Sequence, residues 1–428
     1  MVISMVTAIS VIGAGITVAS VWANSFDDAP AGQRTVDAPQ PAPTPGDEDA
    51  SLDFVQHSAL VPVPMPTPAP PLELTPSTVP AVPTGPSQGG TGPVSGTGGA
   101  LAAADPRASG DFILISRSRL GSLPTSGAAW SQLKAVADSN AGAPNLSNMD
   151  QENNVRVLAK ALVFARTGDA KYRADVIANL KAAIGTEGGS ALALAREAAA
   201  YALAADFIGL AQADPSFDSG KFRPWLRSLL TKSIDDRSLR STHEERANNW
   251  GTHAGASRAA IAAYLGDTAE LARTAQVFHG WVGNRSAYAG FTFGDLSWQP
   301  KPSAPVAVLP SGARMGGQSV GGALPEEMRR GGEFQWPPAG TDYPWGALEG
   351  AVLQAEILHR FGYDAYNWGD AALLRAVRFL FDTAGWRPAG NDQWVFWVID
   401  YRYGTGYRAG APIAPGKNFA WSDWLYSQ

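Results

Sequence analysis

The sequence of 428 residues contains no cysteine, few histidines and only 17% charged residues. The absence of cysteine excludes disulfide bonds, thiolate metal ligands and a cysteine nucleophile. No GxSxG motif and no glycine-rich phosphate loop after a strand is present. The five histidines show no zinc-ligand spacing such as HExxH: His57, His243, His253, His279 and His359. We therefore expect no metal site and no cofactor.

Charge is also absent from residues 2–23, which form one apolar run. The run is long enough to span a bilayer, and Val21-Trp22-Ala23 has the small-x-small pattern that precedes signal cleavage. Residues 1–23 are thus either a signal peptide or an uncleaved membrane anchor. Either one predicts a protein that is secreted, periplasmic or tethered to the cell envelope.

Residues 24–110 lack the composition of a folded domain. They hold 17 of the 32 prolines, followed by a Gly/Ser/Thr run over 85–99. Such a segment buries too little apolar surface to offset its ordering entropy, so we predict a disordered linker. The linker contains nine acidic residues and two arginines, which leaves 31 basic and 30 acidic residues for the rest. The linker therefore has a net charge of −7 and the remainder a net charge of +1. A nucleic-acid partner is not expected, because neither the whole chain nor the remainder is strongly basic.

Residues 111–428 have the periodicity of helices. Three stretches repeat one pattern of helix, Gly-Asp turn and second helix. Glycine ends the first helix and aspartate caps the next. The predicted helix pairs are 153–166 with 172–184, 256–265 with 271–282, and 351–361 with 371–381. Repeated antiparallel pairs predict an all-α domain, an incomplete (α/α) toroid. The stretch 393–401 is either a strand or a buried helix.

The segment 285–343 interrupts this pattern with many glycines and prolines. A long irregular insertion in a compact domain is usually functional. Because it contains tryptophans and arginines, we interpret it as loops that line a cleft. Arg314, Arg329 and Arg330 would give that cleft a local positive potential.

Three groups of residues could carry chemistry. Asn249 and His253 share one face of a predicted helix that opens at Asn248-Asn249-Trp250, and together they could hold a carboxylate. Arg329 and Arg330 could bind an anion in bidentate fashion. Tyr343 stands before a helix, and a phenol near positive charge can act as a base. Each has a plain alternative: a helix cap for Asn248, a structural histidine, surface arginines and a packing tyrosine.

Aromatic rings could add sugar contacts, since a tryptophan face can stack on a sugar ring. We name Trp250, Trp336 and Trp345 as candidates because they flank the polar groups above. Core packing is the alternative role for each of them. Paired acids such as Glu326 and Glu327 give little support to a glycosidase, because neighbouring positions on a helix do not face one bond.

Three motifs together resemble the alginate lyase family of polysaccharide lyases. They are ALVFARTGDAKY over 161–172, NNWGTHAGASRAAIAAYLGD over 248–267, and LPEEMRRG over 324–331 followed by the helix from Tyr343. The resemblance implies an incomplete α/α toroid and an enzyme that needs no cofactor. It assigns the substrate carboxylate to Asn249 and Arg330 and the acid-base role to Tyr343. The family histidine follows the second asparagine, where Trp250 stands here, and we expect His253 to replace it.

We therefore expect β-elimination on an alginate-like, uronate-containing polysaccharide. The expected catalytic residues are Asn249, His253, Arg330 and Tyr343, with His253 as the alternative base. Asn248, Trp250, Arg329, Trp336 and Trp345 are expected to bind the substrate. The expected partner is thus an anionic polysaccharide, and the protein is expected to be a monomer. Two other functions stay open: an α/α-toroid glycoside hydrolase, and an inactive polysaccharide-binding envelope protein.

Overall fold

The computed structural model describes residues 110–427. The predicted segment 1–23 and the predicted linker, apart from Gly110, lie outside the described residues. The described part is mostly helical, which confirms the all-α prediction. Its first helices are α1 (Arg117–Ser122), α2 (Ala128–Asp138), α3 (Asn153–Thr167), α4 (Ala170–Ala183), α5 (Ala191–Phe207), α6 (Leu210–Ala213), α7 (Pro215–Phe217), α8 (Arg223–Leu229) and α9 (Leu239–Glu245). The later ones are α10 (Asn249–Leu265), α11 (Thr268–Trp281), α12 (Pro325–Met328), α13 (Tyr343–Arg360), α14 (Trp368–Arg378), α15 (Trp394–Tyr403) and α16 (Ser422–Leu425).

The predicted helix–turn–helix units form through the expected residues in two cases. α3 ends at Gly168, which has φ of 75°, and the side chain of Asp169 accepts a hydrogen bond from the first turn of α4. α10 ends at Gly266, with φ of 67°, and Asp267 caps α11 in the same way. The left-handed conformation favours glycine, and for this reason the sequence alone predicts these two turns. The third unit differs, because Asn367 rather than Asp364 precedes α14.

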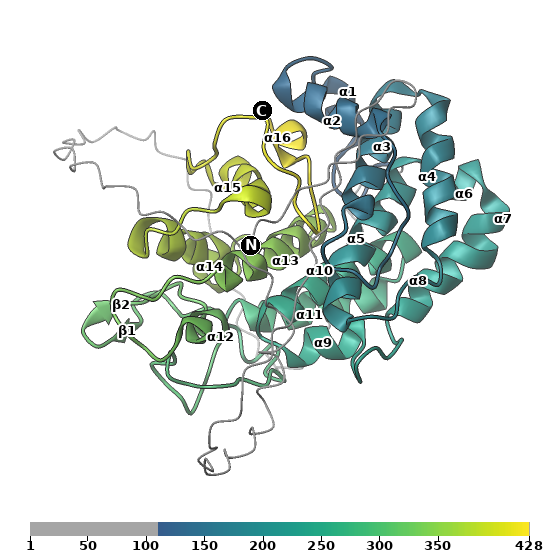
Figure 1. The fold of residues 1–428 in the computed structure, drawn as a ribbon. Helices are drawn as coiled ribbons and strands as arrows, with labels where there is room; N and C mark the ends of the chain where they lie inside the picture. Colours follow the sequence, from purple (N-terminus) through teal and green to yellow (C-terminus); the bar gives the residue numbers. More distant parts are fainter. Residues whose placement is uncertain (1–109, 428) are drawn as a thin grey trace, which may run out of the picture. The chain divides into compact units, whose positions relative to one another are not determined.

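The helices α10 and α13 pack side by side and run parallel. Glycines on α13 allow this close approach, since a methyl group on Gly350 would overlap the backbone of Thr252 and His253. A Cβ on Gly346 would lie 3.9 Å from Nδ2 of Asn249, so residues near both helix starts face each other. Both helices therefore begin at the same end of the domain. Figure 1 shows α10 and α13 next to each other in the middle of the domain.

Helix α5 also packs on α10, and we call the helices α13, α10 and α5 the central row. The hydroxyl of Ser257 on α10 donates to the carbonyl of Ala195 (2.6 Å) and accepts from the N–H of Ala199 (3.0 Å). These two backbone groups of α5 would otherwise bond to each other, so the serine fixes the register between the helices. Trp250 at the start of α10 packs on Leu192 at the start of α5, so these helices also run parallel.

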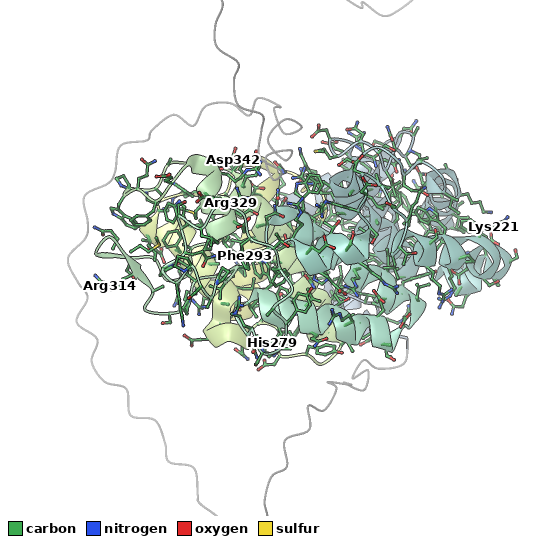
Figure 2. The ribbon with its side chains drawn as sticks, turned by 90° about the horizontal axis from the view of Figure 1, so that it is seen from below. Lys221, His279, Phe293, Arg314, Arg329 and Asp342 are labelled. Carbon is green, nitrogen blue, oxygen red and sulfur yellow. The ribbon has the colours of Figure 1, made fainter. Side chains whose placement is uncertain are left out.

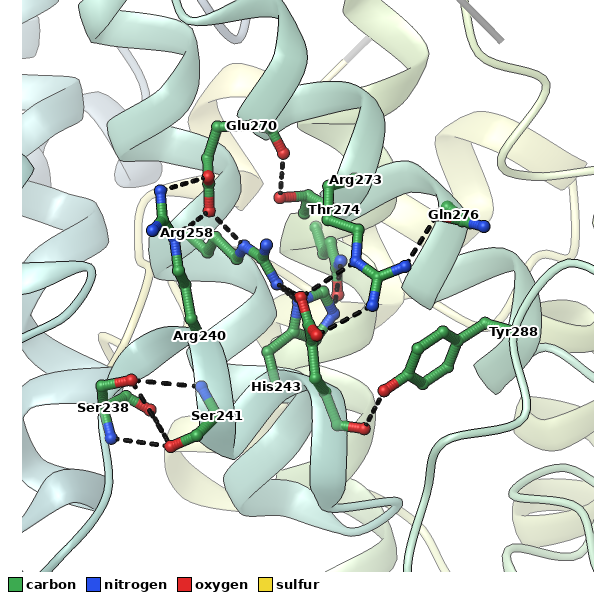
Figure 3. A network of polar contacts seen from close by, with 12 residues as sticks. Ser238, Arg240, Ser241, His243, Arg258, Glu270, Arg273, Thr274, Gln276 and Tyr288 are labelled. Atoms are coloured by element: carbon green, nitrogen blue, oxygen red, sulfur yellow. Dashed lines mark hydrogen bonds and ion pairs between the residues drawn. The ribbon is translucent and has the colours of Figure 1, made fainter. Parts of the chain in front are cut away.

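A buried ion network joins α9, α10 and α11 beside the row (Figure 3). Arg258, which is 1% exposed, bonds to Glu270 (2.6 Å) and to Glu244 (2.9 Å). Arg240 completes the pairing of Glu270, and Arg273 that of Glu244. Each buried charge thus has a partner, as a buried ion requires.

The segment 285–343 is largely irregular, as predicted. It contains the two-residue strands β1 (Arg314–Met315) and β2 (Gln318–Ser319), paired antiparallel, and the helical turn η3 (Arg329–Gly331) after α12. Figure 2 shows Arg314 on this hairpin, well apart from Arg329 and Asp342. The expectation that Arg314 shares a positive region with Arg329 and Arg330 stays a prediction.

The C-terminal part packs against the first helices. The stretch 393–401, left open between strand and helix, is helix α15. The indole of Trp421 donates to the carbonyl of Val155 (3.0 Å), and Asn154 donates to that of Lys417 (2.7 Å). Within residues 110–427, no helix has the length and apolar character needed to cross a membrane.

We predict that Gly350→Ala destabilises the domain by about 1–3 kcal/mol or more, because the added methyl group overpacks the contact between α10 and α13. Gly121→Ala is the matched control, since a Cβ on Gly121 in α1 meets nothing within 4 Å. The control should be neutral or stabilising by up to about 1 kcal/mol. Urea unfolding of both variants measures the difference, and equal midpoints would show that the close packing is unimportant.

Candidate functional site

Asn249 lies at the end of the domain where α10 and α13 both begin. It is buried, and its backbone N–H donates to the carboxyl group of Glu327 on α12. The side-chain oxygen of Asn249 accepts from the N–H of Trp250 (2.9 Å), which leaves Nδ2 directed toward the first turn of α13 near Gly346. The carboxamide therefore presents a donor at the helix start.

Arg330 and Tyr343 meet at the same helix start. The guanidinium carbon of Arg330 lies 4.3 Å from the centre of the Tyr343 ring, and both side chains are partly exposed. Tyr343 and Gly346 are three residues apart on α13 and thus share a face. The structure accordingly brings Asn249, Arg330 and Tyr343 around one helical turn, although they come from three separate parts of the sequence.

The two acids of the LPEEMRRG motif, Glu326 and Glu327, bond to neighbouring residues of the site. Glu326 accepts from Arg329 (3.0 and 3.1 Å) and from the N–H of Gly294 (2.9 Å), so Arg329 serves an internal ion pair. Glu327 is fully enclosed, and burial raises its pKa to about 8. A protonated Glu327 can still accept from Asn249 through its carbonyl oxygen. The prediction that Arg329 binds substrate receives no support from these contacts.

His253 lies one turn below Asn249 and is 0% exposed. Its Nε2 is 3.9 Å from the carboxyl of Glu349, and neither ring nitrogen has a hydrogen-bond partner. Burial, with the charges of Arg196 and Lys417, lowers its pKa well below the ordinary value. The ring is therefore neutral and out of reach of a polymer, which argues against the expected role of His253 as base or charge neutraliser.

The other predicted substrate contacts divide into buried and exposed groups. Asn248 occupies the cap position of α10, but its side chain makes no capping bond and is buried. Trp250 packs on Leu192, and Trp345 packs edge-to-face on Phe396 at 5.3 Å, so both tryptophans belong to the core. Trp336 is 38% exposed and is the predicted aromatic that a ligand can reach.

The sequence analysis did not predict a group of polar residues near the site, which we call the polar layer: Arg196, Glu349, Asp392 and Trp394. The indole of Trp394 donates to Glu349 (3.0 Å), whose pKa is raised to about 7 by burial. The partly exposed Asp392 is influenced by Glu349 and by Asp342, the neighbour of Tyr343, and burial raises its pKa as well. The positive charge of Arg196 acts on both acids. The Arg-Glu pair within the apolar run 191–207 was the signal that could have revealed this layer.

A separate cavity of about 310 Å³ lies at the opposite end of α13. Its arginines have partners: Arg402 pairs with Glu356, and Arg360 with Asp111 (3.2 Å). Since α13 spans 18 residues, this cavity is about 20 Å or more from Tyr343. It therefore takes no part in the site. Among residues 110–427, no group of three or more His, Asp or Glu side chains could hold a metal ion.

Comparison with known families identifies the domain. Residues 131–292 match the family model of alginate lyases. Over these residues the chain is similar to the alginate lyase family. The alginate lyase match includes Asn249 and His253 and ends before Arg330 and Tyr343. A search of curated proteins found no match. The alginate lyase assignment supports an enzyme of the polysaccharide lyase class.

We predict that Glu327→Gln changes how stability depends on pH. In the folded protein Glu327 keeps its proton up to a pKa of about 8, whereas the unfolded chain releases it near 4.5. The wild type therefore loses stability as pH rises from about 4.5 through 8, because the unfolded state binds fewer protons. Glutamine keeps the acceptor for Asn249 and removes this loss.

The measurement is the free energy of unfolding at several pH values between 4 and 8. The difference between Glu327→Gln and wild type should grow in favour of the variant as the pH rises. Glu333→Gln, at an exposed position of the same segment, is the control and should follow the wild type. Parallel curves for Glu327→Gln and wild type would contradict a buried neutral acid.

Proposed function

We propose that the domain over residues 111–428 is a lyase that cleaves a uronate-containing, alginate-like polysaccharide by β-elimination. The observation that carries this proposal is the meeting of Asn249, Arg330 and Tyr343 at the start of α13. The family match of residues 131–292 supports the same reaction class. Tyr343 and Arg330 are partly exposed, so a polymer can reach them.

Asn249 and Arg330 would bind the carboxylate of the sugar that reacts. The C5 proton of a uronate becomes acidic when the charge of the neighbouring carboxylate is neutralised, because the intermediate is enolate-like. Arg330 supplies a cation and Asn249 a neutral donor. The N-termini of α10 and α13 add the positive ends of two helix dipoles at the same place.

Tyr343 would act as base and then as acid. Its phenolate oxygen takes the C5 proton, the C4–O bond breaks, and a double bond forms between C4 and C5. The departing glycosidic oxygen takes a proton from the phenol, which restores the phenolate for the next cycle. His253 lies under the site and has no part in these steps, so its place in our proposal is that of a buried neutral neighbour of Glu349.

The remaining expectations complete the proposal. We propose that the helix pairs form an incomplete α/α toroid, which the parallel central row and the packing of α16 near α2 support. We keep the prediction that the apolar segment and the proline-rich linker export the domain or tether it to the envelope, where polymeric uronates are accessible. We also keep the prediction of a monomer.

The wild-type protein should release products with a C4–C5 double bond from at least one uronate polymer. A panel of alginate, glucuronan and other polyuronates, read by ultraviolet absorbance and by mass analysis of the products, tests this. New reducing ends without absorbance would indicate a glycoside hydrolase instead. Polymer binding without any product would indicate a binding protein.

We predict that Tyr343→Phe lowers turnover by at least about 10²–10⁴-fold, because it removes the acid-base group and leaves the carboxylate contacts in place. Polymer binding should stay close to that of the wild type. Tyr172→Phe is the control, since Tyr172 on α4 bonds to Asp138 far from the site and should affect stability alone. Unchanged turnover in folded Tyr343→Phe would exclude Tyr343 from the mechanism.

A further inference from the structure

Arg196 on α5 lies level with the polar layer beneath Tyr343. It is five residues after the start of α5, as His253 is four after the start of α10 and Glu349 six after the start of α13. The three helices run parallel, so all three residues lie about 6–9 Å from the helix starts. Helical side chains lean toward the N-terminus, and the long arginine side chain therefore extends toward the end that carries the site.

One nitrogen of the Arg196 guanidinium group is buried without a hydrogen bond. Its Nε atom is buried and has no partner, while the residue as a whole remains partly exposed. A buried donor without a partner is rare in folded proteins and points to a bound group or water. The charge of Arg196 reaches His253, Glu349 and Asp392, so it acts into the space between α5, α10 and α13.

The acids around Arg196 do not cancel its charge. Burial raises the pKa of Glu349 to about 7, and it raises those of Asp392 and Glu197 as well. Burial thus favours the protonated forms of these acids, and in that form they neither neutralise the arginine nor repel a polyanion. Lys417 adds a second cation near the same acids, although it also pairs with Asp150 (2.7 Å).

We infer that Arg196 binds the carboxylate of a second uronate, in the same polymer chain as the sugar held by Arg330 and Asn249. This inference rests on the proposed function. A polymer that lies across the starts of α13, α10 and α5 passes from Tyr343 over Asn249 to Arg196. Packed helices are about 8–10 Å apart, so the second carboxylate belongs to a sugar further along the polymer. Arg196 thus selects polymers that carry consecutive uronates.

The test measures binding of uronate oligosaccharides of increasing length to Tyr343→Phe, with and without Arg196→Gln, by calorimetry. The oligosaccharides come from the polymer that the wild type cleaves. Loss of Arg196 should weaken binding of the longer oligosaccharides by roughly 10- to 100-fold, as expected for a charged hydrogen bond. The shortest oligosaccharides, which end before α5, should bind unchanged. Arg196→Lys, which keeps the charge, should recover part of the affinity.

Arg227→Gln, an exposed arginine of α8, is the matched control for charge and should leave every affinity unchanged. Thermal unfolding identifies a variant that has lost its fold, and Arg196→Lys then carries the comparison. Equal weakening at all lengths, or none at any length, overturns the inference about Arg196 while the lyase proposal stands. If the Tyr343→Phe protein binds no uronate at all and the wild type cleaves none, both proposals fail.

Discussion

The close parallel contact between α10 and α13 determines most of what this domain can do. It depends on glycine at position 350, where a side chain would meet the backbone of the neighbouring helix. Because the helices run parallel, both begin at one end, and Asn249 faces the first turn that carries Tyr343. Glu327 then joins the irregular segment to α10, which places Arg330 over the Tyr343 ring. The absence of a side chain at position 350 thus lets the two helices bring together groups that are far apart in the sequence.

Burial decides which ionisable groups are charged near the site. Desolvation drives His253, Glu327 and Glu349 toward their neutral forms. The partly exposed Arg330 thus lies close to acids whose neutral forms are favoured by burial.

Local signals made the helical fold predictable. Gly168 and Gly266, each followed by aspartate, marked helix ends through a left-handed turn that few other residues accept. Arg330 and Tyr343 stood in a recognisable order. His253 failed as a prediction because helical spacing gives the face of a residue but not its depth. Trp345 and Trp250 are likewise buried. The sequence did not single out Arg196, because only the parallel packing of α5 places it level with His253 and Glu349.

The bond between Glu327 and the backbone of Asn249 has a consequence for how such domains diversify. Arg330 follows Glu327 within one short turn, so its position is set before the chain enters residues 331–342. That loop, which presents Trp336, only has to return to Tyr343 at the start of a rigid helix. A change in the length or composition of this loop therefore need not move Arg330 or Tyr343.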